Sequence, residues 1–280
     1  METVRRVFSQ SDFDRFAALS GDDNPIHVDP EFAARSKFGR TVAHGMFLYA
    51  NACGMLDTPV PGQNTVQIED ELMFPSPTFT DEEVEIRVEA SPVQPGEVVS
   101  DLRVAIVRPD GNVGLQGRSV VRILEPTAAP ASGSRGPDQS DSDCQSFKGM
   151  ELGQRAETRR TFTAADMIEY VSLTGDALPL FTDAEYARSK GLEGVLVPRA
   201  LLGGLFSYLL GTRLPGPGTN YLKQRLFFLA PACVEQELVA SVEIVRIRSE
   251  KQLVNLCTVC TDPSDQVVCH GEALVLVSDV

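Results

Sequence analysis

The segment Ser20–Pro30, "SGDDNPIHVDP", places a carboxylate, an amide and an imidazole close together at Asp22, Asn24 and His27. A carboxylate and an imidazole that converge on one point can hold a water molecule and move its proton. This is general acid–base chemistry, carried out by groups whose pKa values burial adjusts. The alternative is a polar loop, because Asp and Asn beside Gly and Pro often form turns, and a single histidine is more often packed than catalytic.

An internal repeat helps to separate these two interpretations. A shift of 154 positions, which places Gly21 on Gly175, aligns the second half of the chain with the first without a gap. Other identical pairs in this register are Phe8 and Phe162, Pro25 and Pro179, Asp29 and Asp183, Leu72 and Leu226, and Gly117 and Gly271. A constant register over the whole length indicates a duplication. It predicts two similar domains, 1–126 and 155–280, joined by a flexible linker at 127–154 that begins with a stretch rich in Ala, Pro, Gly, Ser and Asp.

The second copy of the polar segment reads "TGDALPLFTDA" and keeps the scaffold but not the polar set. Asp22 is matched by Asp176, whereas Asn24 has become Leu178 and His27 has become Phe181. The turn therefore does not need the amide or the imidazole, and function is the better explanation for both. Asp22 keeps a structural interpretation beside the catalytic one, because its counterpart persists without a histidine.

The residues at the start of the following helix also differ between the two halves, and again only the first half has a residue suited to catalysis. "AHGM" in the first half faces "VPRA" in the second, so Gly45 is replaced by Arg199. A glycine at a helix N-terminus exposes its backbone N–H and lets a carbonyl oxygen approach, where the helix dipole favours negative charge. That arrangement would serve as an oxyanion hole. A glycine required only for packing is the alternative.

The pattern of each half predicts helices followed by strands. In the first half we expect a short helix with Ser11 as N-cap and Phe13 and Phe16 inward, a second short helix capped by Asp29, and a long apolar helix over about 45–56. The expected strands are 65–74, 82–93, 98–109 and 116–125, with a helix at 198–210 and strands at 224–230, 237–248, 252–261 and 267–277 in the second half. One apolar helix followed by four antiparallel strands suggests an α+β fold in which the sheet wraps around the helix.

Composition narrows the function classes. The chain has 280 residues, 42% of them hydrophobic, and a net charge of −14, which argues against non-specific binding of nucleic acid. Its longest apolar patch, 200–211, is well short of the roughly 20 residues that span a bilayer, and no apolar signal-peptide region follows the first residues. Six scattered cysteines do not form a disulfide framework, and Cys257 and Cys260 of "CTVC" should face opposite sides of a strand rather than bind a metal. We expect a cytoplasmic protein without membrane or nucleic-acid partners.

The stretch Phe16–Ala33, "FAALSGDDNPIHVDPEFA", followed by "GRTVAHGM", closely resembles the MaoC-like (R)-specific enoyl-CoA hydratases, or hydratase 2 family. The resemblance implies a tandem (double) hot-dog fold, each half an antiparallel sheet around a long central helix. It implies a hydro-lyase that interconverts trans-2-enoyl and (R)-3-hydroxyacyl thioesters by syn addition of water. No metal or redox cofactor is implied, and coenzyme A enters only as part of the substrate.

In this family the matching positions hold the chemistry, so Asp22 and His27 are expected to be the catalytic pair that holds the water, supported by Asn24. The backbone N–H of Gly45 is expected to bind the thioester oxygen. Since only the first half keeps these residues, one active site per chain is expected. The second half would widen the acyl pocket for a bulky or branched substrate.

Several further assignments accompany this interpretation. The basic residues nearest to the site are candidates for the phosphates of coenzyme A: Arg35, Lys37 and Arg40, with Lys223 and Arg225 as further candidates. A solvated surface charge is the alternative for each of them.

His44 and His270 are interpreted as structural. The competing functions are dehydration of acyl-carrier-protein substrates, thioester hydrolysis on the same fold, and non-catalytic acyl binding. Two fused hot-dogs would form a pseudo-dimer that either stands alone or pairs again as a homodimer.

Overall fold

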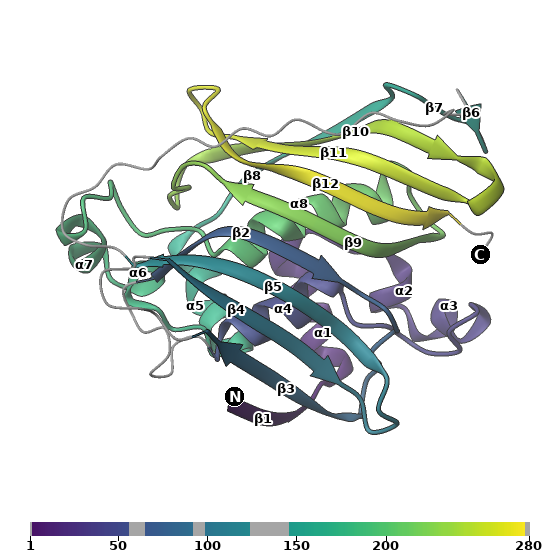
Figure 1. The fold of residues 1–280 in the computed structure, drawn as a ribbon, viewed down its shortest axis with the longest axis horizontal. Coiled ribbons are helices and arrows are strands. Elements are labelled where there is room, and N and C mark those ends of the chain that lie inside the picture. Colours follow the sequence, from purple (N-terminus) through teal and green to yellow (C-terminus); the bar gives the residue numbers. More distant parts are fainter. Residues whose placement is uncertain (1, 56–64, 92–98, 124–145, 278–280) are drawn as a thin grey trace.

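The two halves of the chain form one continuous antiparallel sheet in the computed structural model, which describes residues 2–55, 65–91, 99–123 and 146–277. The sheet has 10 strands in the order β1-β3-β4-β5-β2-β9-β12-β11-β10-β8. This order is symmetric about the β2–β9 seam, as expected for a duplication. Figure 1 shows the two sets of strands meeting there. The tandem hot-dog prediction is confirmed.

Each half follows the same order of elements: a strand, a helix, two short helices, a long helix and four strands. The first half contains β1 (Glu2–Val7), α1 (Gln10–Ser20), α2 (Pro25–Val28), α3 (Pro30–Arg35), α4 (Gly45–Cys53), β2 (Thr65–Met73), β3 (Glu83–Ala90), β4 (Val99–Val107) and β5 (Val113–Ile123). The second contains β8 (Arg155–Thr161), α5 (Ala164–Thr174), α6 (Pro179–Thr182), α7 (Ala184–Ser189), α8 (Arg199–Thr212), β9 (Thr219–Phe228), β10 (Glu237–Arg248), β11 (Leu253–Thr261) and β12 (Val267–Val277). A short 3-10 turn, Ser249–Lys251, joins β10 to β11.

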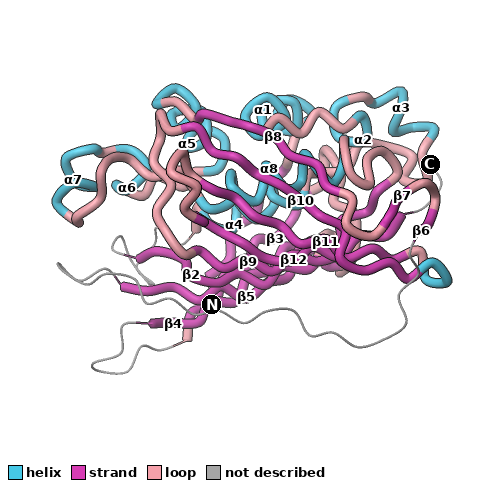
Figure 2. The backbone as a smooth tube through the Cα atoms, turned by 90° about the horizontal axis from the view of Figure 1, so that it is seen from above, coloured by secondary structure: helices cyan, strands magenta, loops and turns pink. Residues whose placement is uncertain are grey.

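The helices lie on one side of the curved sheet, and α4 and α8 pack against each other at its centre (Figure 2). Their close approach depends on glycine, because a Cβ at Gly203 of α8 would lie 2.5 Å from the sulfur of Met46 in α4. Both helices are almost wholly buried, which explains their apolar composition. Among the described helices, none is long and apolar enough to cross a membrane.

The seam between the halves is closed by ion pairs on the outer face of the sheet. Lys223 of β9 pairs with Glu71 of β2, and Arg225 pairs with Glu69 at 2.7 Å. Both basic side chains therefore have carboxylate partners at the β2–β9 pairing that joins the two halves of the sheet. Neither residue is among those that line the larger pocket described below.

Some expected boundaries were wrong. The N-cap of α1 is Ser9 rather than Ser11: its hydroxyl accepts from the N–H of Asp12, whose carboxylate accepts from the N–H of Ser9 at 2.8 Å. This capping box satisfies two N–H groups of the first turn at once. The long helix α4 ends at Cys53, and residues 56–64 lie outside the described part of the chain.

Strands β1 and β8 were not expected at all. They form the two edges of the sheet, and most of their side chains are exposed or half-buried, so they lack an apolar alternation. The expected linker, 127–154, is structured in its described part, where β6 (Ser146–Phe147) pairs with β7 (Met150–Glu151). Gly153 and Gln154 then bond to the backbone of Ile244. Residues 124–145 lie outside the described residues.

One buried carboxylate opposes the stability of this fold. Asp70 of β2 is 0% exposed, and no hydrogen bond reaches either of its oxygens within the described residues. Burial raises its pKa to about 6, while the hydroxyls of Tyr49 and Ser119, which bond to each other, offset part of the shift. A carboxyl whose pKa is higher in the folded than in the unfolded chain costs stability as the pH rises through both values.

We therefore expect Asp70→Asn to stabilise the protein in a pH-dependent way. The wild type should lose stability between about pH 4 and pH 6, as the buried carboxyl ionises, and a rise in pKa of this size corresponds to roughly 3 kcal/mol. Urea unfolding at pH 4.5 and pH 8 would measure the difference, with Asp265→Asn in the exposed β11–β12 turn as control. A gain from Asp70→Asn that is equal at both pH values would contradict the assignment.

Candidate functional site

The carboxylate of the polar segment is positioned by the end of α1. Gly21 ends the helix in the left-handed conformation, with φ 83°, and its N–H donates to the carbonyl of Ala17. The hydroxyl of Ser20 accepts from the N–H of Asp22 at 3.2 Å and donates to the carbonyl of Phe16. The second half repeats this geometry at Gly175, with φ 77°. The turn is therefore a property of the fold, as the repeat predicted.

Asp22 is buried and only partly satisfied. It is 1% exposed, and its Oδ2 accepts a hydrogen bond of 2.6 Å from the hydroxyl of Ser207 in α8. Its Oδ1 has no partner among the described residues. Burial raises the pKa of this carboxyl, and the nearby His27 and the Ser207 hydroxyl oppose that rise. One carboxylate oxygen is thus left to bind a water or a substrate group.

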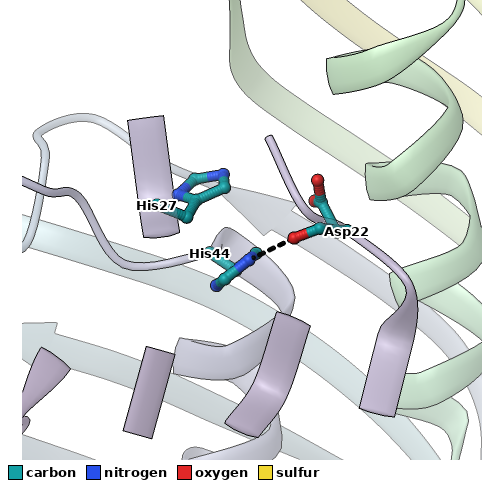
Figure 3. Close-up of side chains that lie close together, drawn as sticks. All are labelled: Asp22, His27 and His44. Atoms are coloured by element: carbon teal, nitrogen blue, oxygen red, sulfur yellow. Dashed lines mark hydrogen bonds between the residues drawn. The ribbon is translucent and has the colours of Figure 1, made fainter. Parts of the chain in front are cut away.

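His27 lies on the short helix α2 with a defined tautomer. Its Nδ1 is 2.6 Å from the carbonyl oxygen of Val42. A carbonyl only accepts, so Nδ1 carries the proton and Nε2 of the neutral ring carries the lone pair. Burial lowers the pKa of His27, and the charge of Asp22 opposes that effect. The ring is therefore held neutral near pH 7, with its basic nitrogen facing the side where Asp22 lies (Figure 3).

Asn24 joins this segment to the second half. Its side-chain oxygen accepts from the N–H of Ile26 and so caps α2, while its amide nitrogen donates to the carbonyl of Gly211 at 3.1 Å. A Cβ at Gly211 would lie 2.9 Å from that amide nitrogen. Together with Ser207, Gly211 shows that α8 of the second half holds the polar segment of the first. Sequence reasoning missed both residues. The spacing of Gly203, Ser207 and Gly211, one small residue every four along α8, was the available signal.

His44, interpreted from sequence as structural, lies directly beside the pair. Its Nε2 is 2.8 Å from the backbone carbonyl oxygen of Asp22, and its ring is stacked on that of His27 with centroids 3.9 Å apart and planes inclined by 30°. Figure 3 shows the three side chains and the hydrogen bond from His44. Burial places the pKa of His44 well below its ordinary value.

The donor set argues against a metal ion at this cluster. Asp22, His27 and His44 bring ligand atoms within 4.8 Å of one another. However, Nδ1 of His27 and Nε2 of His44 both donate to carbonyl oxygens, and the other nitrogen of His44 points away from Asp22 (Figure 3). A cation would meet only Nε2 of His27 and Oδ1 of Asp22, fewer than zinc requires from a protein. The arrangement suits proton transfer instead.

The pair opens into a pocket built by both halves, with about 1140 Å³ of empty space including its opening to solvent. Its apolar lining includes Phe32, Phe38, Leu48, Phe74, Leu210, Tyr221 and Leu222. Gly45 also lines the pocket, in the first turn of α4, where backbone N–H groups have no acceptor within the helix. A Cβ at Gly45 would lie 2.7 Å from the ring of Phe74, so packing also requires a glycine there.

The candidate phosphate-binding residues occupy different places. Lys37 lines the pocket, whereas Arg35 and Arg40 do not. Arg35 is exposed in the last turn of α3. Arg40 pairs with Glu82 and stacks on Phe79, with its guanidinium carbon 4.3 Å from the ring centroid.

The equivalent region of the second half holds larger side chains and a smaller cavity. Phe181 and Leu178 are buried where the first half has His27 and Asn24. Asp176 accepts a hydrogen bond of 2.8 Å from the Tyr170 hydroxyl, and Arg199 stacks on Phe228 at 4.7 Å, in the position of Gly45. The cavity that remains there has about 440 Å³ of empty space.

Comparisons with known proteins agree with this geometry. A family model described as "MaoC like domain" matches residues 1–107. An (R)-specific enoyl-CoA hydratase from Aeromonas caviae is 36% identical over 46% of this chain and 97% of its own length. A mitochondrial 3-hydroxyacyl-[acyl-carrier-protein] dehydratase from Solanum lycopersicum is 34% identical over 46% of this chain and 78% of its own length.

Solved structures match the whole chain at lower identity and therefore show the fold alone. A MaoC-like dehydratase superposes with a TM-score of 0.78 and 17% identity, covering 99% of this chain and 98% of its own. A Mycobacterium tuberculosis protein described as a double hot-dog gives a TM-score of 0.72 and 15% identity, over 98% of this chain and 95% of its own. The hydratase and dehydratase sequences above match about half of this chain, and the double hot-dog structures match its full length. This protein therefore belongs to the MaoC-like family of hydratases and dehydratases, which are hydro-lyases, in its double hot-dog form.

Proposed function

We propose that this protein interconverts trans-2-enoyl and (R)-3-hydroxyacyl thioesters of coenzyme A, using the site of the first half. The observation that carries the proposal is the pairing of two proton acceptors, Nε2 of His27 and the unpartnered Oδ1 of Asp22, at the wall of an apolar pocket. The names of the relatives, hydratases and dehydratases of thioesters, support the same chemistry.

The reaction needs a water held by both acceptors. Its oxygen attacks C3 of the enoyl thioester while the Asp22–His27 pair takes one of its protons, and the C2=C3 π electrons move into the enolate. The pair then returns a proton to C2, which gives the 3-hydroxyacyl thioester. Because both transfers come from one side of the substrate, the addition is syn. The two groups are coupled through their charges and act as a unit.

The developing enolate places negative charge on the thioester oxygen. We assign its stabilisation to the N–H of Gly45 and to the positive end of the α4 dipole. Asn24 supports the site by tying the Asp22 loop to Gly211. Of the basic residues, Lys37 lines the pocket, and we assign it to the coenzyme A phosphates; Arg35 and Arg40 are not among the lining residues. No step of this mechanism requires a metal or redox cofactor.

The second half contributes to the pocket rather than to the proton transfers. Leu210, Tyr221 and Leu222 of the second half complete the apolar wall. Because both halves contribute to the wall of a pocket with about 1140 Å³ of empty space, we propose a bulky or branched acyl group. Acyl carrier protein is the competing handle, since two relatives carry that name, but the net charge of −14 disfavours an acidic carrier.

The proposal predicts hydration of crotonyl-CoA or a larger enoyl-CoA, followed as loss of enoyl absorbance. Asp22→Ala and His27→Ala should each lower kcat by about 10²- to 10⁴-fold, as expected for loss of general acid–base catalysis. Glu250→Ala, at an exposed residue outside the pocket lining, is the control. Full activity in either catalytic variant would remove that residue from the mechanism. If the enzyme preferred the same acyl group attached to acyl carrier protein, the substrate would be the carrier-protein thioester rather than the coenzyme A thioester.

Ser207 provides a second test, because its counterpart in the repeat is Cys53. Ser207→Ala should lower kcat by about 10- to 100-fold, since a hydrogen bond to a charged group contributes roughly 1.5–3 kcal/mol and about 1.4 kcal/mol corresponds to a factor of ten in rate. It should also raise the pKa of Asp22 further, so the pH profile should move upward. Cys53→Ala, at the same depth in α4, should keep activity per folded molecule. Equal effects of the two substitutions would contradict a role of the second half in the site.

The degenerate half should remain inactive even with its two polar residues restored. In a His27→Ala background, Leu178→Asn with Phe181→His should not raise hydration above that of His27→Ala alone, because Arg199 still occupies the glycine position at the start of α8. Single-turnover assays at high enzyme concentration would detect residual chemistry. Recovered activity in this triple variant would mean that the glycine is not needed as an oxyanion donor.

A further inference from the structure

We propose that His44 is a positioning residue that fixes the geometry of the catalytic pair: it holds the backbone of Asp22 and supports the ring of His27. This inference rests on the proposed function of that pair. His44 itself is not expected to exchange a proton with the substrate, since it is not among the residues that line the pocket.

A single side chain contacts both members of the pair. The Nε2–H of His44 donates to the carbonyl of Asp22 at 2.8 Å, and its ring lies against the ring of His27 at 3.9 Å between centroids. Asp22 is in the loop after α1, His27 is on α2, and His44 is the N-cap residue of α4. His44 therefore links the two catalytic segments to α4, whose first residue, Gly45, lines the pocket.

Helix capping does not account for a histidine here. The side chain of His44 makes no capping hydrogen bond to α4. At the equivalent position of the second half the residue is Pro198, and α8 still begins at the next residue. The fold thus forms the same helix start without a histidine, and His27 and His44 are both absent from the half that has lost the site.

Packing does not account for it either. His44 is 0% exposed, and its Nδ1 has no hydrogen-bond partner among the described residues. A buried unsatisfied polar atom costs about 1–3 kcal/mol. The aromatic rings of Phe13 and Phe16 surround it, with centroids 6.5 and 5.2 Å away. An apolar ring would fill this space without the unsatisfied nitrogen, so the Nε2–H directed at Asp22 is the reason to keep a histidine.

The charge state of His44 matters to its role. Burial and the neighbouring His27 keep its pKa well below the ordinary value, so the ring stays neutral. When His27 takes up the proton of the water, a neutral neighbour at 3.9 Å does not oppose the new positive charge. The titratable groups that act on the cluster are Asp22 and Asp23 from the α1–α2 loop, with Tyr221 of β9 near Asp22.

Two substitutions separate the two contacts. His44→Phe keeps a stacked ring and loses the donor to Asp22, whereas His44→Gln keeps an N–H donor and loses the ring. His270→Phe is the matched control, because His270 is also stacked on an aromatic ring, that of Phe227 at 5.2 Å, but lies on β12 away from the pocket. Circular dichroism and thermal unfolding would report whether each variant folds.

Both His44 variants should lower kcat by about 10- to 100-fold, with a smaller change in KM, because small misplacements of catalytic groups cost this much. His270→Phe should change neither parameter. In His44→Gln the exposed face of His27 gains water, so the pKa of His27 should rise toward its ordinary value. In His44→Phe the retained ring should keep that pKa close to the wild-type value.

The pKa and tautomer of His27 are measured directly by ¹⁵N NMR titration, which is practical because the chain has only three histidines. This readout does not depend on turnover. A folded wild type that hydrates no thioester would defeat the proposed function while leaving the NMR test of His44 in force. Unchanged kcat in both variants, or an unchanged His27 titration in His44→Gln, would overturn the positioning role.

Discussion

The site depends on one contact between the halves: the packing of α8 against the loop that carries Asp22. Two hydrogen bonds make this contact, from Ser207 to the carboxylate of Asp22 and from the amide of Asn24 to the carbonyl of Gly211. Because Asp22 is 1% exposed, its charge would be costly without such a donor. The burial that raises the pKa of Asp22 and the contact that limits the rise come from the same interface.

This dependence gives the second half a role in the proposed site, although it lacks the histidine and the asparagine of the first half. In the second half, Phe181 and Arg199 line a smaller cavity beside the turn at Asp176. Yet α8 must present a hydroxyl at Ser207 and bare backbone at Gly211, since a Cβ there would displace Asn24. The reciprocal position, Cys53 in α4, faces a site without a histidine and is free of that demand. The two copies therefore contribute different elements to the proposed site: the first contributes its polar loop, and the second contributes its long helix.

The sequence was informative wherever the two copies could be compared. The repeat separated Asn24 and His27 from the scaffold of the turn, and it marked Gly45 as different from Arg199. The fold followed from the same repeat and from the alternation of the inner strands. The edge strands β1 and β8 were missed because most of their side chains are polar and none is fully buried, so they carry no apolar period. Ser207 and Gly211 were missed because a serine and a glycine within an apolar helix resemble packing residues until the partner loop is seen.

His44 illustrates the limit of reasoning about one residue at a time. A histidine beside a glycine at the start of a helix is naturally interpreted as structural. His44 does act on the structure of the site, since it is not among the residues that line the pocket. Its importance follows from two distances that no local pattern contains, one to the carbonyl of Asp22 and one to the ring of His27. A base must hold its lone pair on the water, and a ring fixed only by its Nδ1–H could still tilt about that bond. A second, flat and uncharged surface removes this freedom without adding a competing charge, which is why the neutral state of His44 is as much a part of the site as the basicity of His27.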